Sequence, residues 1–172
     1  TPAGWVAPTT WEDVPEPAQH PGDEQTTSLS VIDSDRNAVA ITMTLGPSFG
    51  AGFCYSGVFF NNAITRFGSV TGNNWAPGRT PRSDTSPTIV LENDEVRLVS
   101  GARGSSRIPA AIVYNILYAL EYGMPTREAM VAARAFPFYS SATLHIERSF
   151  PESIRTELAA RGWNLTTYAP ED

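Results

Sequence analysis

Lysine is absent from this chain of 172 residues, and cysteine and histidine are scarce. All 12 basic residues are arginine, which excludes a lysine base or a lysine Schiff base within the chain. The single cysteine, Cys54, cannot form an intrachain disulfide. The two histidines, His20 and His145, stand far apart and have no cysteine or paired carboxylate at ligand spacing. The sequence therefore predicts no metal site.

Charge and hydropathy disfavour two further classes of partner. The net charge of -6 at pH 7 argues against nucleic acid, whose phosphates attract basic surfaces. A membrane-spanning helix needs about 20 apolar residues in a row. The longest candidate, residues 108–120, is too short and contains Asn115. A hydrophobic content of 41% with 17% charged residues is instead typical of a folded globular domain.

The first 25 residues differ in composition from the rest of the chain. They hold five of the 14 prolines and a group of acidic residues, so we expect an irregular arm over 1–25 and a folded part over 26–172. After the arm, residues 27–31 alternate apolar and polar side chains, and a polar turn at 33–37 leads to an apolar stretch at 38–45. This pattern predicts an antiparallel hairpin.

The middle of the chain is rich in glycine and turn-forming residues. A glycine-rich loop at 46–57 precedes a short predicted strand at 58–60, and a long loop is expected over 68–87. The stretches 88–91 and 96–100 flank a further turn. They predict a second hairpin.

Helices are predicted in the second half of the chain. Residues 107–121 are mostly apolar, with Pro109 suited to a first helical turn and Gly123 to a C-terminal cap. Thr126 is expected to cap a second helix.

The last part of the chain predicts one strand and one helix. The strand is expected at 145–148, and the helix at 151–161, where Gly162 ends it. Hairpins followed by helices, a strand and a helix predict an α+β fold built in layers.

Seven motifs in order resemble the small subunit of the γ-glutamyltranspeptidases, which are N-terminal-nucleophile hydrolases. They are QTTSLSVID, NAVAITMTL, SFGAG, VFFNN, TSPTIV, SGARGSSRI and EYGM. The resemblance covers residues 25–162 and implies a four-layer αββα sandwich of which this chain supplies part. It also implies that a large subunit from the same precursor completes the sandwich, and that no metal, nucleotide or flavin cofactor is needed.

By this resemblance, the precursor cuts itself between Gln25 and Thr26, and Thr26 becomes the nucleophile. The chemistry is coherent because a free α-amine has a pKa of about 7.7–8.0, which suits a general base at neutral pH. That amine would lie on the same residue as the hydroxyl it deprotonates. Without the resemblance, Thr26 is simply a β-branched residue at a strand edge.

The 25 residues ahead of Thr26 leave three interpretations open. The sequence is that of a precursor, or the arm stays uncut and the protein is inactive, or cleavage occurs before Thr1. The last alternative is disfavoured because Thr1 has no strand behind it to position its hydroxyl.

The resemblance assigns three further residues to catalysis. Thr44 matches a threonine that hydrogen bonds to the hydroxyl of the nucleophile, although a strand threonine needs no such role. Gly104 and Ser105 match two glycines whose backbone N–H groups form the oxyanion hole, and backbone donors survive the change of glycine to serine. One such donor contributes about 3–4 kcal/mol to lowering the barrier.

The positions that read the substrate depart from the family pattern. Gly46 replaces an asparagine, and Arg66 replaces an aspartate that binds the ammonium group of the substrate. Of two serines that hold the substrate carboxylate, one is kept as Ser83 and the other is Asp84. Arg66 suits an anionic group, unless it is a solvated loop residue.

Three functions follow from these matches and departures. The first is a threonine-nucleophile acyl hydrolase or transferase acting on a small, non-glutamyl substrate. Similar relatives act in lincomycin-type antibiotic biosynthesis, where a carbon–carbon bond is cut. The second is an ordinary γ-glutamyl hydrolase or transpeptidase, and the third is an unprocessed, non-catalytic subunit. A biosynthetic enzyme is expected in the cytoplasm, whereas typical family members are exported to the periplasm or secreted.

Overall fold

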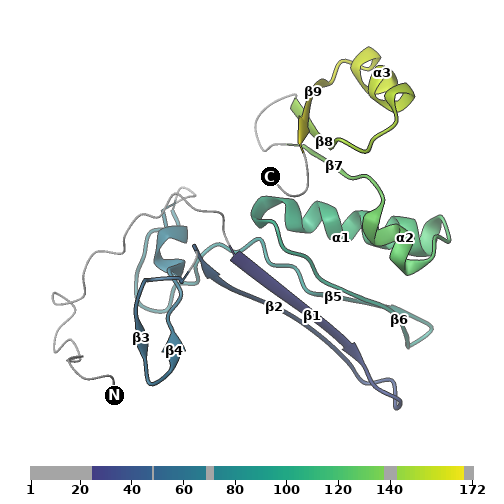
Figure 1. Ribbon diagram of the computed structural model, residues 1–172. Coiled ribbons are helices and arrows are strands. Elements are labelled where there is room, and N and C mark those ends of the chain that lie inside the picture. Colours follow the sequence, from purple (N-terminus) through teal and green to yellow (C-terminus); the bar gives the residue numbers. More distant parts are fainter. Residues whose placement is uncertain (1–24, 48, 69–71, 138–142, 169–172) are drawn as a thin grey trace.

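The computed structural model describes residues 25–47, 49–68, 72–137 and 143–168 (Figure 1). Residues 1–24 of the expected arm lie outside this part. The strands are β1 (Gln25–Ile32), β2 (Ala38–Gly46), β3 (Cys54–Tyr55), β4 (Val58–Phe59), β5 (Thr88–Glu92), β6 (Glu95–Ser100), β7 (Ala135–Pro137), β8 (Thr143–Glu147) and β9 (Asn164–Tyr168). The helices are α1 (Ile108–Ile116), α2 (Thr126–Val131) and α3 (Glu152–Ala160), with shorter turns η2 (Ala63–Arg66), η3 (Ser105–Arg107) and η4 (Leu117–Glu121).

The two predicted hairpins form and lie against each other. β1 pairs antiparallel with β2, and β5 pairs antiparallel with β6. Both strands of the first hairpin contact β6, and β2 also contacts β5 (Figure 1). The approach is close at Gly101, where an added Cβ would lie 1.8 Å from Ser28 Oγ. Small residues such as Ser28 and Thr42, whose hydroxyl oxygens are 3.2 Å apart, allow this contact.

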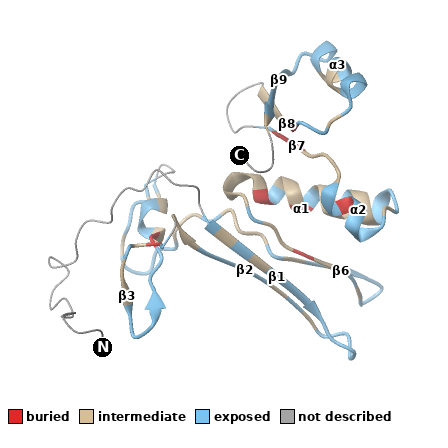
Figure 2. Cartoon of the chain, in the orientation of Figure 1, coloured by how far each residue is buried: buried red, intermediate tan, exposed pale blue. Residues whose placement is uncertain are grey.

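The opposite face of the β1–β2 hairpin is apolar and open. Five of its side chains are between 40% and 56% exposed: Leu29, Val31, Val39, Ile41 and Met43. They alternate with the small residues because successive side chains of a strand point to opposite faces. Figure 2 shows β1 largely exposed and β2 as a mixture of exposed and intermediate residues. We call these five residues the outer apolar face.

Helix α1 covers the β5–β6 hairpin on the side away from β1 and β2 (Figure 1). Ile108 and Ile112 are 1% and 3% exposed and anchor it. Pro109 lies in the first turn as predicted, and the helical run continues through the π-type turn η4. The expected cap at Thr126 is wrong. Pro125 holds the cap position of α2, and no side-chain hydrogen bond closes that helix.

The C-terminal region forms its own sheet with a core. β7 pairs antiparallel with β8, and β9 pairs parallel with β8 after the crossover helix α3. β8 confirms a strand near the predicted 145–148, whereas β7 and β9 were not predicted. Phe136, Ile146 and Glu147 are at most 5% exposed. The mixture of hairpins, sheet and helices confirms the α+β class.

Candidate active site

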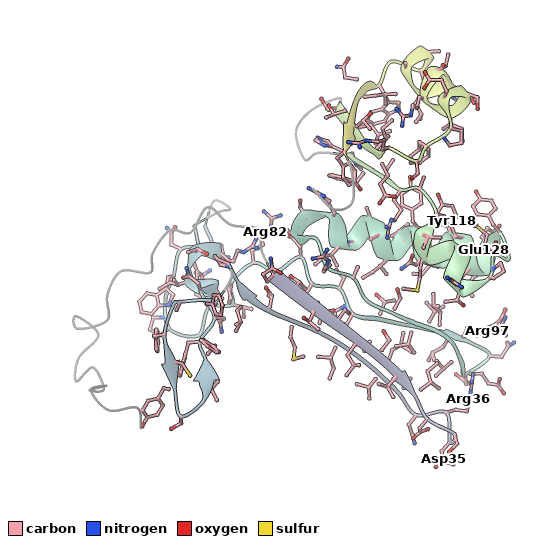
Figure 3. The ribbon with its side chains drawn as sticks, viewed as in Figure 1. Asp35, Arg36, Arg82, Arg97, Tyr118 and Glu128 are labelled. Atoms are coloured by element: carbon pink, nitrogen blue, oxygen red, sulfur yellow. The ribbon has the colours of Figure 1, made fainter. Side chains whose placement is uncertain are left out.

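A pocket of about 110 Å³ lies where β1 begins, β2 ends and η3 leads into α1. Figure 1 shows these ends together on one side of the hairpins, and Figure 3 places Arg82 there. The lining residues are Thr26, Thr44, Leu45, Gly46, Asn61, Asn62, Ala63, Arg66, Pro81, Arg82, Ser83, Asp84, Thr85, Ser105 and Ile108. Seven of the eight residues singled out in the sequence are among them. The eighth, Gly104, directly precedes Ser105 in the chain.

Thr26 and Thr44 face each other across the hairpin. They are register partners, and the pairing is irregular between Gln25 and Thr26. The Thr44 hydroxyl donates a 2.8 Å hydrogen bond to the carbonyl oxygen of Gln25 and accepts one of 2.9 Å from the Gly46 N–H. In the uncut chain, Thr44 therefore binds the carbonyl next to Thr26, where the resemblance predicts a bond to the Thr26 hydroxyl. A donor on that oxygen polarises the Gln25–Thr26 peptide bond.

The Gly104–Ser105 turn has an unusual backbone. Gly104 has φ 125° and Ser105 has φ 53°, both in the region that favours glycine. A side chain in this region costs about 1–3 kcal/mol, so the surroundings must stabilise the turn. The Arg107 N–H closes it by donating to the Gly104 carbonyl at 3.0 Å. The turn thus places Ser105 at the pocket that Thr26 lines.

Three charged side chains form a cluster on the pocket wall. Asp84, whose side chain is 10% exposed, lies 3.1 Å from Arg82 Nη2 and 3.9 Å from Arg66 Nη1. Two guanidinium groups thus lie beside one carboxylate on this wall. This cluster joins η2 to the loop before β5.

Three further polar residues line the pocket, and the sequence predicted only one of them, Ser83. Ser83 Oγ lies 2.7 Å from Thr85 Oγ1, so Ser83 reaches a neighbouring hydroxyl. Arg82 and Asn62 line the pocket but were not predicted. Asn62 is 5% exposed, and its Oδ1 has no partner among the described residues. The VFFNN motif could have signalled Asn62, whereas Arg82 carries no local signal.

Two kinds of feature are missing from the described residues. Within them, no group of three or more His, Cys, Asp or Glu side chains is arranged to hold a metal ion. In the same ranges, no helix has both the length and the apolar character that crossing a bilayer requires.

Comparisons with known proteins agree with the geometry. A family model for gamma-glutamyltranspeptidase matches residues 5–171. The glutathione hydrolase proenzyme of Escherichia coli is 34% identical over 152 residues, which cover 80% of this chain and 26% of that protein. The capsule biosynthesis protein CapD proenzyme of Bacillus anthracis is 32% identical over 142 residues, which cover 83% of this chain and 26% of that protein.

Solved structures show the same fold. A mutant of Helicobacter pylori gamma-glutamyltranspeptidase superposes with a TM-score of 0.76 at 30% identity, covering 83% of this chain and 84% of that chain. The N-terminal-nucleophile hydrolase architecture is thereby established. The chain spans about a quarter of the length of the curated relatives it matches. Matched from residue 5 to residue 171, with its threonine pair at the pocket, the chain belongs to the gamma-glutamyltranspeptidase family.

Proposed function

We propose that this chain is the nucleophile-bearing part of an autoprocessed acyl hydrolase or acyltransferase, with Thr26 as the nucleophile. The observation that carries the proposal is the 2.8 Å hydrogen bond from Thr44 to the Gln25 carbonyl. It engages the peptide bond whose cleavage would free the Thr26 amine. The same pocket also contains Ser105 of the candidate oxyanion turn.

Processing uses Thr26 and Thr44 together. The Thr26 hydroxyl attacks the Gln25 carbonyl carbon, while the Thr44 hydroxyl donates to the oxygen that gains charge. The C–N bond breaks, the nitrogen takes up the proton that the hydroxyl loses, and an ester links Gln25 to Thr26. Water hydrolyses this ester, which leaves a carboxylate on Gln25 and a free α-amine on Thr26.

Turnover repeats the attack on an external carbonyl. The free amine takes the proton of the Thr26 hydroxyl, and the oxygen adds to the substrate carbonyl carbon. The backbone N–H groups of Gly104 and Ser105 stabilise the oxyanion. The leaving group departs with the proton from the amine, and water or an acceptor then removes the acyl group from Thr26.

The substrate is a small molecule that presents an anion in place of the glutamyl ammonium group. This part of the proposal is supported by Arg66 and Arg82, which place two guanidinium groups on the pocket wall, Arg66 where the family has an aspartate. At about 4 Å and an effective dielectric of 20, one charge pair amounts to about 4 kcal/mol. A guanidinium group repels an ammonium group at the same distance. Specialised antibiotic metabolism in the cytoplasm, including cleavage of a carbon–carbon bond, suits such a diverged pocket.

A second candidate function is ordinary γ-glutamyl hydrolysis or transpeptidation. It is favoured by the relatives, among them the glutathione hydrolase proenzyme of Escherichia coli. Asp84 also supports it, since this carboxylate on the pocket wall can receive an ammonium group if the arginines rearrange. A third candidate, an uncut and non-catalytic subunit, requires the Gln25–Thr26 bond to persist.

A larger subunit from the same precursor is the proposed partner. The outer apolar face supports it, because five adjacent apolar side chains on one strand pair form a surface that assembly would bury. The relatives named proenzymes are about four times longer than the matched region, which leaves sequence for such a subunit. In the αββα architecture, a layer is expected on this side of the hairpin.

The deciding experiment compares Thr26→Ala with Thr27→Ala in the full-length protein. Thr27 is the exposed neighbour in the same strand and serves as the matched control. We expect intact mass to show cleavage before residue 26 in the wild type and in Thr27→Ala, and none in Thr26→Ala. Uncut wild type that still turns over substrate would disprove the mechanism.

Two p-nitroanilides distinguish the substrate classes. Glutaryl p-nitroanilide carries the carboxylate without the ammonium group, and γ-glutamyl p-nitroanilide carries both. We expect a kcat/KM at least tenfold higher for the glutaryl compound. Faster turnover of the γ-glutamyl compound would establish the second candidate function instead.

A further inference from the structure

We propose that Arg107 is a positioning residue that fixes the Gly104–Ser105 turn by stacking its guanidinium on the aromatic side chains of the C-terminal sheet. This inference rests on the proposed function, because it concerns the oxyanion donors of that site. It assigns the β7–β8–β9 sheet a role in the reaction although that sheet does not line the pocket.

The contacts of Arg107 join the two regions directly. Its backbone N–H closes the turn on the Gly104 carbonyl at 3.0 Å. Its guanidinium carbon lies 4.7 Å from the ring centroid of Tyr168 and 5.5 Å from that of Phe136. Cations within about 6 Å of an aromatic centroid are attracted by the ring face. One residue therefore links the turn to β7 and β9.

The aromatic support is itself held in place by a buried carboxylate. Glu147 is 4% exposed and accepts hydrogen bonds from the Arg134 backbone N–H at 3.1 Å and from Arg134 Nε at 3.0 Å. The Tyr168 hydroxyl donates to the same carboxylate at 3.3 Å. The Phe136 and Tyr168 rings meet at 73° with centroids 5.5 Å apart. Arg107 thus stacks on side chains with little freedom to move.

The turn requires such support because its backbone is unfavourable. Gly104 and Ser105 both have positive φ. This conformation is unfavourable for serine because of its Cβ, whereas glycine adopts it readily. On the C-terminal side, Ile108 is 1% exposed and fixes the start of α1. Arg107 lies between this anchor and the turn. When its stacking is lost, we expect Ser105 to relax toward negative φ and its N–H to turn away from the pocket.

The test uses phenylboronic acid, a probe that needs the nucleophile and the oxyanion donors but no glutamyl recognition. The Thr26 oxygen adds to boron, its proton moves to the Thr26 amine, and boron becomes a tetrahedral anion. Boron NMR reports the tetrahedral signal, and titration of the matured full-length protein gives the dissociation constant. Thr26→Ala supplies the blank.

We expect Arg107→Ala to weaken boronate binding about 10–100-fold, since an oxyanion donor contributes about 100–1,000-fold to rate and this variant misplaces it without deleting it. Arg107→Lys should lie between the two, and Arg103→Ala, in the same loop but exposed, should bind like the wild type. With an anilide that the wild type cleaves, kcat should fall while KM changes less than threefold. Unchanged boronate affinity in folded Arg107→Ala would overturn the inference.

Tyr168 provides a second pair of variants should Arg107→Ala fail to fold. Tyr168→Phe keeps the ring beneath Arg107 but loses the hydrogen bond to Glu147, so it should weaken boronate binding less than Tyr168→Leu, which removes the ring and should lose about tenfold. Equal boronate affinity in these two variants would show that stacking of Arg107 on Tyr168 plays no part. If the matured wild type binds boronate no better than the Thr26→Ala blank, the acyl-transfer function itself is overturned, and the inference with it.

Discussion

The β1–β2 hairpin and the β7–β8–β9 sheet bury their apolar residues in opposite ways. In the C-terminal sheet, Phe136 and Ile146 are 5% and 0% exposed. In the hairpin, the face against β5 and β6 is formed by small residues such as Ser28 and Thr42, while the outer apolar face is open. The sheet therefore has a core of its own, whereas the hairpin has its apolar surface on the outside.

The two regions contribute to the pocket in different ways. The hairpin provides the two threonines from a surface that needs a cover to become well buried. The C-terminal sheet, through Arg107, supports the Gly104–Ser105 turn, whose Ser105 lines the pocket. If the proposed larger subunit covers the outer apolar face, the pocket lies between a region with its own core and a region that assembly would complete.

The largest effect is expected from removing the core of the C-terminal sheet. Ile146→Ala deletes a side chain that is 0% exposed and should lower the free energy of unfolding of this region by about 2–5 kcal/mol. Amide hydrogen exchange of β8 and β9 in the full-length protein measures this loss locally. Protection that stays at the wild-type level would contradict the claim that this sheet has its own core.

The next effect tests the close approach of the two hairpins. Gly101→Ala forces Ser28 to move, since the new Cβ would lie 1.8 Å from Ser28 Oγ and 3.1 Å from its Cβ. We expect a loss of about 1–3 kcal/mol in thermal stability analysis. Combining it with Ser28→Ala should recover part of the loss, because the clashing oxygen is gone. Additive losses in that double variant would show that the two sites are independent.

A smaller effect distinguishes a covered hairpin face from an open one. Ile41→Thr keeps a β-branched side chain but places a hydroxyl on the outer apolar face. If the larger subunit covers that face, the full-length protein should lose about 1–2 kcal/mol, since the hydroxyl is buried without a partner. Val131→Thr, at a residue 74% exposed at the end of α2, is the control with no expected change. Equal effects of the two substitutions would disprove the cover.

The smallest effect concerns the alkaline titration of the C-terminal sheet. Burial, followed by the charge of Glu147, raises the pKa of Tyr168 from 10.0 to about 12. The unfolded chain therefore loses this proton at lower pH than the folded chain, so the stabilising contribution is full below pH 10 and disappears as pH rises toward 12. Tyr168→Phe should show a shallower loss of stability between pH 10 and 12. If Tyr168→Phe and the wild type lose stability identically between pH 10 and 12, the raised pKa of Tyr168 does not contribute to stability.

Local pattern was sufficient to predict most of the fold. The alternation at 27–31 and 38–45 predicted the first hairpin, and the positions of Pro109 and Gly123 predicted the long helical run. β7 was missed because three residues that include a proline carry no periodicity. β9 was missed because its pairing partner, β8, lies beyond a helix in the sequence.

The residues of the candidate site also differ in whether a local pattern could predict their contacts. Thr26 and Thr44 were predictable as neighbours, because hairpin register brings them together. Arg82 reaches the pocket through a long loop, and the link from Arg107 to Tyr168 joins residues 61 positions apart. No local pattern contains such contacts, since they arise only when separate elements come together in three dimensions.

The Thr44 hydroxyl has a single hydrogen, and in the uncut chain that hydrogen is committed to Gln25. The Thr44 oxygen also accepts a hydrogen bond from the Gly46 N–H, so the hydroxyl both donates and accepts. Departure of the preceding segment would release that hydrogen at the moment when Thr26 first acquires its amine. If the proposed cleavage occurs, the Thr44 hydrogen would thus become available to the Thr26 hydroxyl only after the Gln25–Thr26 bond is broken.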